Sequence, residues 1–258
     1  MLGPPRTTAP LGAPRPPPPA ARAGRPGAGR AGTTSPWCGR QRIGQACADQ
    51  CRLPCLPVPH PAQLPALILL VRHGATEWSV SGRHTGRTDL ALTDQGVAQA
   101  VSAGPLIDEL LGDHEPLVFT SPLARAARTA ELALPQHPAR PAPALMEYDY
   151  GDYEGLTSSQ ILQRDPAWDL FHSGCPGGES IVQVSARCDE FMAEVQREGA
   201  GRAVVAFTHG HLSRILTARM LNLPAAGGAS LWNDTATVGV INEHRGKLVL
   251  VGWNLRAY

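Results

Sequence analysis

The chain has 258 residues, of which 43% are hydrophobic and 17% are charged, and its formal net charge is +1. This length fits one ordinary domain with a tail or two small domains, and the apolar content is sufficient for a sizeable core. The balanced charge gives no general attraction to nucleic acid or to a membrane, and no apolar run approaches the roughly 20 residues of a membrane span. No stretch of 1–64 has the pattern of a secretory signal, so we expect a cytoplasmic protein.

Residues 1–64 differ in composition from the rest of the chain. They are rich in Pro, Gly, Ala and Arg, with four consecutive prolines at 16–19. Such a stretch buries too little apolar surface to offset the entropy lost on ordering, so we predict a disordered extension. Three interpretations of this extension stay open: a flexible extension, a basic tether for an anionic partner, and a mis-assigned translation start, which we favour.

The charge is unevenly distributed along the chain. Residues 1–64 hold eight arginines and one acidic residue, which leaves 15 basic and 21 acidic residues for the remainder. An acidic domain can bind an anionic ester only where its few cations are concentrated. Four of the six cysteines lie in 1–64 and form no C-x-x-C pair, so a zinc site there is not expected.

From Ala66 onward, the sequence alternates between strand and helix patterns. The predicted strands are apolar runs at Ala66–Arg72, Leu117–Thr120, Ala203–Thr208, Thr235–Asn242 and Lys247–Asn254. The predicted helices run from Thr93 to about Leu111 with a kink or split near Pro105, from Ser121-Pro122 onward, from Ser180 to about Glu198, and from Gly210 to about Asn222. This alternation predicts an α/β fold, a three-layer α/β/α sandwich around a largely parallel sheet.

Two of the predicted strands end in the same dipeptide. His73 follows the first strand, His209 follows Ala203–Thr208, and a glycine comes directly after each histidine. Ligands bind beyond the carboxyl ends of parallel strands, so the two histidines can face each other across one crevice. The glycines, Gly74 and Gly210, allow a sharp turn and the close approach of a ligand. A lone histidine at a strand end is more often structural, but the pair favours a functional site.

Two further segments supply groups suited to a phosphate ester. Arg125 lies at the predicted start of a helix, where free N–H groups attract anions, and its guanidinium could bind two phosphate oxygens. The acidic segment 147–154 could supply the proton that a leaving alkoxide requires. Spacing does not decide between its four carboxylates, Glu147, Asp149, Asp152 and Glu154. A solvated surface role is the alternative for each of these residues.

These segments resemble, in the same order, the motifs of the histidine phosphatase superfamily, in the branch that includes phosphoglycerate mutase. The segments that carry the resemblance are RHGATEW at 72–78, GRHTGRTDLALTDQG at 82–96, SPLARA at 121–126, EYDYGDYEG at 147–155, PGGES at 176–180 and THGHLSR at 208–214. The resemblance covers about 66–258. It implies a phosphoglycerate mutase-like fold with one catalytic domain at 65–258.

The resemblance also implies a role for each matching residue. His73 matches the nucleophile that becomes phosphohistidine, and Glu147 matches the proton donor. The groups expected to hold phosphate or substrate are Arg72, Arg125, His209, Thr85, Gly86, Ser79 and Gly210. The chain departs from the family pattern at Ala75, where Glu is frequent, and at Ser79, where Asn is frequent, although Ser79 could still bond a phosphate oxygen. The resemblance implies no metal and no other cofactor.

The sequence favours a phosphomonoester hydrolase of the acid phosphatase type that acts on a small phosphorylated substrate. Mutase relatives carry a long basic insertion after the proton-donor segment, whereas 148–180 contains only Arg164 and His172 as possible cations. The motifs look most like those of bacterial acid phosphatases and also resemble the fungal sedoheptulose bisphosphatase type. A 2,3-bisphosphoglycerate-dependent mutase, a sugar bisphosphatase and a non-enzymatic phosphoester-binding protein stay open as alternatives. The sequence indicates neither the physiological substrate nor the oligomeric state.

Overall fold

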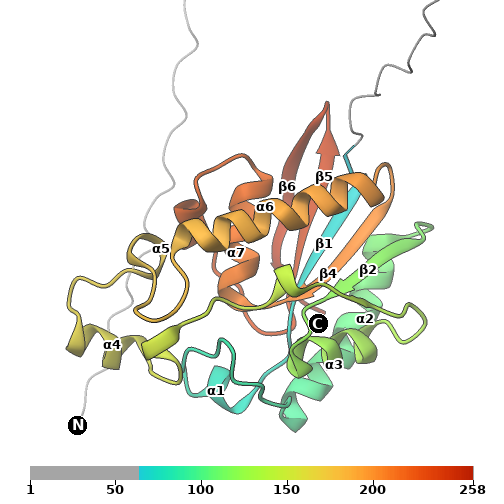
Figure 1. Cartoon of the computed structure of the whole chain (residues 1–258). Helices are drawn as coiled ribbons and strands as arrows, with labels where there is room; N and C mark the ends of the chain where they lie inside the picture. Colours follow the sequence, from blue (N-terminus) through green and yellow to red (C-terminus); the bar gives the residue numbers. More distant parts are fainter. Residues whose placement is uncertain (1–63, 258) are drawn as a thin grey trace, which may run out of the picture. The chain divides into compact units, whose positions relative to one another are not determined.

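The computed structural model describes residues 64–257. The predictions for 1–63 lie outside the described residues. Within 64–257, no helix combines the length and the apolar character needed to cross a membrane. The centre of the fold is a six-stranded sheet with the strand order β3-β2-β4-β1-β5-β6 (Figure 1). Its strands are β1 (Leu67–Arg72), β2 (Pro116–Thr120), β3 (Arg140–Pro141), β4 (Ala203–Thr208), β5 (Val238–His244) and β6 (Lys247–Leu255).

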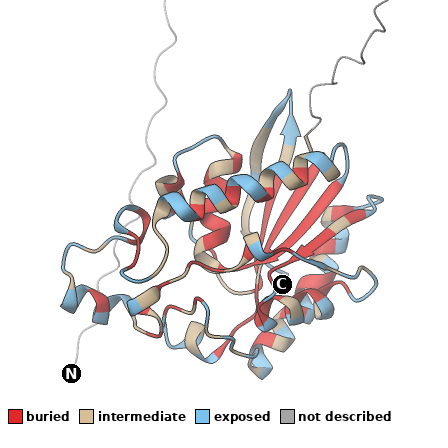
Figure 2. Cartoon of the chain, in the orientation of Figure 1, coloured by how far each residue is buried: buried red, intermediate tan, exposed pale blue. Residues whose placement is uncertain are grey.

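The sheet is largely parallel, as predicted. Strands β1, β2, β3 and β4 run in one direction, with β1 paired to β4 and β4 paired to β2. The hairpin of β5 and β6 completes the sheet as antiparallel partners beside β1. The turn between these two strands contains Gly246 at a φ of +78°, a conformation that favours glycine. The central strands are almost fully buried (Figure 2), as expected for strands covered on both faces.

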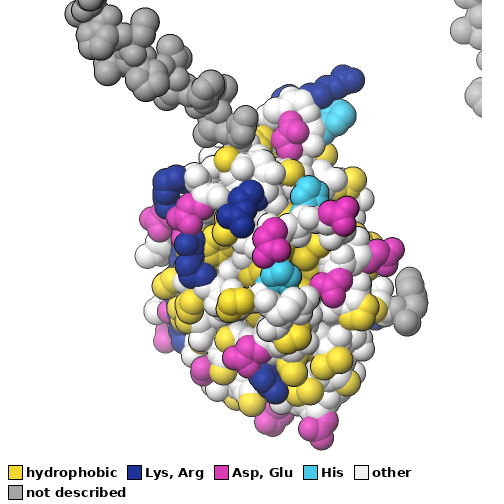
Figure 3. All heavy atoms as spheres, turned by 90° about the vertical axis from the view of Figure 1, so that its right-hand side faces the viewer, with side chains coloured by type: hydrophobic (Ala, Val, Ile, Leu, Met, Phe, Trp, Pro, Cys, Tyr) yellow, Lys and Arg dark blue, Asp and Glu magenta, His cyan; other side chains and the backbone are white. Residues whose placement is uncertain are grey.

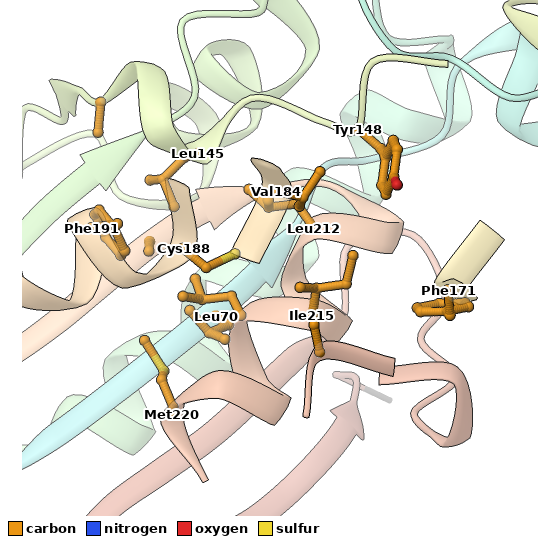
Figure 4. Packing of buried hydrophobic residues seen from close by; sticks show 14 of the residues in the cluster. Leu70, Leu145, Tyr148, Phe171, Val184, Cys188, Phe191, Leu212, Ile215 and Met220 are labelled. Atoms are coloured by element: carbon orange, nitrogen blue, oxygen red, sulfur yellow. The ribbon is translucent and has the colours of Figure 1, made fainter. Parts of the chain in front are cut away.

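Helices cover both faces of the sheet, which confirms the three-layer prediction (Figure 1). Alternate residues of β1 point to opposite layers because side chains alternate along a strand. Leu69 packs in the cluster that includes α2 (Asp94–Leu111) and α3 (Ala124–Ala133). Leu70 packs with α6 (Ile181–Glu198) and α7 (Gly210–Met220), where Figure 4 shows it among Cys188, Phe191 and Ile215.

The region between the second strand and α6 contains several short elements that the sequence patterns did not reveal. These are β3, the 3-10 turns η1 (Pro143–Leu145) and η2 (Gly151–Tyr153), and the helices α4 (Ser158–Arg164) and α5 (Leu170–Ser173). Two other short elements, α1 (Glu77–Val80) and η3 (Ala225–Ser230), were also not predicted. Elements of three to seven residues show too few turns for a helical period to be recognised.

The start predicted for the helix that follows β2 is wrong. Helix α3 begins at Ala124 with Leu123 as its N-cap, and Ser121-Pro122 lies before it. The backbone N–H of Ser121 donates to the carbonyl of Phe207 in β4 at 2.9 Å. This bond keeps Ser121 against the neighbouring strand, so the helix starts later. Helix α2 runs unbroken over 94–111 with Pro105 inside it, so the split considered at this proline does not occur.

Two glycines let the start of α2 lie directly against the end of β1. A Cβ atom on Gly96 would lie 2.1 Å from the carbonyl oxygen of Ala75, and one on Gly74 would lie 2.3 Å from the carbonyl oxygen of Gly96. Neither position has room for a side chain. Gly74 therefore serves this contact between two backbones, and not the close approach of a ligand as the sequence suggested. The contact holds the segment after β1 in place at the carboxyl edge of the sheet.

We expect Gly96→Ala to destabilise the fold by about 2–3 kcal/mol, because the added methyl group must push two backbone segments apart. The matched control is Gly227→Ala, whose Cβ atom would meet nothing closer than 3.7 Å, and which should change stability by less than about 1 kcal/mol. The free energy of unfolding, measured by urea denaturation of both variants, checks this. Equal stability of the two variants would contradict the packing argument.

Candidate active site

A cavity of about 360 Å³ is lined by residues that follow β1 and β4. Six of the nine residues predicted for the site line it: Arg72, His73, Ser79, Thr85, Glu147 and Gly210. The other three, Gly86, Arg125 and His209, lie behind this lining. Three arginines and three histidines border the cavity, whereas acidic and basic side chains are interspersed on the outer face in Figure 3. The fold therefore concentrates its cations here, as an acidic domain that binds an anion requires.

His73 presents one ring nitrogen to the cavity in a defined protonation state. Its Nδ1 lies 2.7 Å from the carbonyl oxygen of Gly74. A carbonyl oxygen only accepts hydrogen bonds, so Nδ1 carries the hydrogen and Nε2 carries the lone pair. The ring is buried, and burial, followed by the charges of Arg72 and Arg125, lowers the pKa of His73 well below its ordinary value of 6.5. His73 is therefore a neutral imidazole with its lone pair on Nε2.

His209 stands beside His73, with 5.2 Å between the ring centroids. Its Nδ1 accepts a hydrogen bond from Nε of Arg125 at 3.2 Å, and its Nε2 lies 2.8 Å from the hydroxyl of Ser121. An arginine only donates, so this histidine is also neutral here and donates from Nε2. Burial, and then the charge of Arg125, lowers its pKa well below 6.5. The same two arginines, Arg72 and Arg125, therefore act on both histidines.

Arg72 has a donor available for an anion. Its Nη1 donates to the carbonyl of Asn233 at 2.7 Å. Its Nε is buried and has no hydrogen-bond partner within residues 64–257. A buried unpartnered N–H is costly unless a ligand accepts from it. A Cβ atom on Gly210 would lie 3.3 Å from the guanidinium carbon of Arg72, so the glycine after His209 leaves room for this guanidinium.

Arg125 is fully buried and is occupied by protein acceptors. Besides its bond to His209, it donates to the carbonyls of Thr85, Gly86 and Thr88 at 2.9–3.0 Å. The carboxylate of Glu154 accepts from the N–H groups of Gly86 and Thr88 in the same loop. Arg125 thus binds carbonyl groups of the loop 85–88, and Glu154 binds N–H groups of the same loop. In this geometry Arg125 holds His209 and the loop that carries Thr85, and it is not among the residues that line the cavity. Its predicted role as a phosphate clamp stays a prediction.

Gly86 serves the packing of that loop. A Cβ atom at Gly86 would lie 2.5 Å from the carbonyl oxygen of Tyr148.

Ser79 forms hydrogen bonds with a neighbouring residue. Its hydroxyl donates to the carbonyl of Thr76 at 2.9 Å and accepts from the Thr76 N–H at 2.8 Å. Ser79 therefore closes the capping box of α1, and its hydroxyl hydrogen is already in use.

The structure separates the four carboxylates that spacing alone left equivalent. Only Glu147 lines the cavity. It is buried, and its two oxygens accept hydrogen bonds from the N–H groups of Tyr148, His211 and Leu212. The last two belong to the first turn of α7, so Glu147 is fixed at the positive end of that helix. Asp149 pairs with Arg87, Glu154 holds the loop, and Asp152 is exposed.

A second wall of the cavity includes two histidines, His84 and His211, to which the sequence analysis gave no role. The hydroxyl of Tyr150 lies 2.6 Å from Nδ1 of His211, whose ring stacks on that of His84 at 5.6 Å. Nε2 of His84 lies 3.2 Å from the hydroxyl of Ser158. Burial lowers the pKa of His84 to about 4, so it too is neutral at physiological pH. His211 is the second histidine of the motif THGHLSR. Its place in this motif was the signal that could have identified it.

Two further cations, to which the sequence analysis gave no role, also line the cavity. Arg83 precedes His84, and Arg214 lies one turn into α7. Arg214 is buried, donates to the carbonyls of Gly228 and Ala229, and stacks over the ring of Phe171. Neither arginine forms a salt bridge within the described part of the chain. In residues 64–257, no three His, Cys, Asp or Glu side chains are grouped to hold a metal ion.

Neutral histidines lie beside arginines at the carboxyl edge of a mostly parallel sheet, an arrangement suited to an enzyme that binds phosphate. The sequence model of the histidine phosphatase superfamily (branch 1) matches residues 68–256. The chain therefore belongs to this superfamily.

Named relatives agree with this assignment. An acid phosphatase of Mycobacterium tuberculosis is 43% identical over 180 residues, which cover 69% of this chain and 87% of that protein. The solved structure of an open reading frame from Mycobacterium tuberculosis aligns with a TM-score of 0.71 at 40% identity, covering 74% of this chain and 98% of that chain. A 2,3-bisphosphoglycerate-dependent phosphoglycerate mutase of Methylobacterium sp. is 34% identical over 67% of this chain and 89% of that protein. The resemblance seen in the motifs is confirmed.

The lowered pKa of His73 predicts a pH dependence. Its neutral form persists as the pH falls through 6.5 and is lost only at a lower pH. We expect kcat/KM, corrected for ionisation of the substrate phosphate, to stay flat between roughly pH 6 and 7.5. Initial rates across this range check the expectation. A decline that follows a group titrating at the ordinary histidine value would contradict it.

Proposed function

We propose that the chain is a phosphomonoester hydrolase of the acid phosphatase type, which transfers the phosphoryl group first to His73 and then to water. The observation that carries the proposal is the 2.7 Å contact between Nδ1 of His73 and the carbonyl oxygen of Gly74. It leaves a lone pair on Nε2 of a neutral ring, beside the unpartnered Nε of Arg72. A nucleophile and an anion-binding donor thus border one cavity.

In the first step, Nε2 of His73 forms a bond to phosphorus while the phosphorus–oxygen bond of the ester breaks. Arg72 binds the non-bridging oxygens, where charge must be stabilised during phosphoryl transfer. Glu147 gives its proton to the leaving alkoxide. The N–H groups at the start of α7 hold its carboxyl group at the cavity wall.

In the second step, water attacks phosphorus and the bond to Nε2 breaks. Glu147, now a carboxylate, takes the proton of the attacking water, which restores both residues. His209 supports both steps from beside His73. A phosphoryl dianion next to His209 favours its charged form. Arg125 donates to Nδ1 of the neutral ring, and protonation of His209 would break this bond, because a protonated Nδ1 only donates.

One observation favours a second candidate. The sequence argument against a mutase counted cations only within 148–180, but Arg83 and Arg214 reach the cavity from outside that segment. They could bind a second anionic group of the substrate. This favours a sugar bisphosphatase, such as a sedoheptulose bisphosphatase, or a phosphoglycerate mutase. A non-enzymatic phosphoester-binding protein is less well supported, because His73, His209 and Glu147 are all in place.

We expect His73→Ala to reduce phosphatase turnover to the background rate, because no other cavity histidine has its lone pair directed by a main-chain carbonyl. The matched control is His172→Ala, an exposed histidine that does not line the cavity. Quenched reactions with 32P-labelled substrate should give an acid-labile, base-stable phosphoprotein with the parent chain and the control only. Turnover by His73→Ala, or an acid-stable label, would contradict the proposal.

Replacing Glu147 with Gln should slow alkyl phosphates at least about tenfold more than 4-nitrophenyl phosphate, since nitrophenolate leaves without a proton. Asp152→Asn, a change at an exposed carboxylate of the same segment, is the control and should leave both rates unchanged. The ratio of kcat values for the two substrates checks this. Equal losses with both substrates would reject Glu147 as the proton donor.

Product analysis distinguishes the two candidate functions. With 3-phosphoglycerate and 2,3-bisphosphoglycerate, a hydrolase releases inorganic phosphate, whereas a mutase forms 2-phosphoglycerate without net release. We expect release of phosphate, with sugar monophosphates and bisphosphates compared in the same panel. Formation of 2-phosphoglycerate faster than phosphate release would establish the mutase instead.

A further inference from the structure

Two exposed apolar side chains stand at the edge of the active-site cavity. Seven large hydrophobic residues are exposed in the described part of the chain. Only Trp232, which is 68% exposed, and Val80, which is 67% exposed, line the cavity. These two side chains form an apolar part of the cavity's rim. Exposed apolar surface beside a functional pocket commonly contacts a ligand.

Trp232 is held in one orientation although it is exposed. Its Nε1–H donates to a carboxylate oxygen of Asp234 at 3.1 Å. Its carbonyl accepts from the indole N–H of Trp253 at 2.6 Å. Asp234 is itself bonded by Asn254 and Arg256. Because the N–H group of Trp232 is already used, the exposed indole offers a ligand its apolar ring surface.

The segment that carries Trp232 is tied to the phosphate-binding arginine. The carbonyl of Asn233 accepts from Nη1 of Arg72 at 2.7 Å, and the Asn233 amide donates to Ser213 at 2.9 Å. Adjacent residues are only about 3.8 Å apart along the chain. The indole is therefore held near the guanidinium of Arg72, which is hydrogen-bonded to the residue next to Trp232. A phosphate held by Arg72 places its ester substituent in the cavity that Trp232 borders.

We propose that Trp232, together with Val80, binds the leaving group of the substrate and favours phosphomonoesters whose alcohol carries a planar aromatic ring, such as aryl or nucleoside monophosphates. This inference rests on the proposed function, since it names the substrate class of that same cavity. An aromatic ring gains from stacking on an indole face, whereas a small polyol presents no planar face. A preorganised ring loses little conformational freedom on binding. Trp232 acts in binding and takes no part in bond breaking.

The test compares 1-naphthyl phosphate with glycerol 2-phosphate in four variants. Trp232→Ala should raise KM for the naphthyl ester about tenfold more than KM for the glycerol ester. The ratio of variant to parent kcat should be similar for the two esters. Trp232→Phe, which also loses the bond to Asp234 but keeps a ring, should retain most of the preference. Val80→Ala should show a smaller loss in the same direction. The matched control is Val182→Ala, exposed on α6 away from the cavity, and it should match the parent.

Equal changes in KM for the two esters in Trp232→Ala would overturn the proposal. So would a loss in Trp232→Phe as large as in Trp232→Ala, because that result would assign the effect to the bond with Asp234. Calorimetric binding of 1-naphthylmethylphosphonate supplies a readout independent of turnover, and Trp232→Ala should weaken it about tenfold. An unchanged Kd would overturn the inference, even in a chain without phosphatase activity. Loss of the proposed function is detected separately, by the absence of turnover of both esters in the parent chain.

Discussion

The parallel pairing of β1 with β4 is the constraint on which the site depends. The two strands run in register, with Arg72 opposite Thr208, and the N–H of His73 donates to the Thr208 carbonyl at 2.9 Å. Because both strands end at the same level, the residues that follow them must lie side by side. This register places the rings of His73 and His209 5.2 Å apart. Bonds to the main chain and to buried side chains then fix the orientation of each ring.

Positive charge around neutral imidazoles is the electrostatic consequence of that arrangement. Burial and nearby arginines lower the pKa of His73 and of His209 well below 6.5. Arg125 makes four hydrogen bonds within the protein. Its charge therefore acts on the site mainly through long-range electrostatics, and less through a direct hydrogen bond. Arg72 keeps one donor unpartnered within residues 64–257. The cavity therefore favours an incoming phosphate dianion while His73, the proposed nucleophile, stays unprotonated.

Patterns local in the sequence predicted much of this fold. The apolar strands, the long capped helices and the two His-Gly corners were found, because strand periodicity and turn residues are local properties. The role of Arg125 was not, since its partner His209 lies 84 residues away. The histidines of the second wall, His84 and His211, were given no role for the same reason, and counting cations within one segment overlooked Arg83. Side chains that meet only through the tertiary fold leave no local pattern.

The central claim is that phosphate becomes bonded to Nε2 of His73, because the Gly74 carbonyl occupies Nδ1. Two-dimensional 31P–1H NMR of the phosphoenzyme, trapped during turnover and digested under basic conditions, identifies both the residue and the nitrogen that carry phosphorus. The account predicts a single phosphohistidine in the peptide containing His73, with phosphorus on Nε2. Phosphorus on Nδ1 of His73, or on His209 or His211, would contradict it.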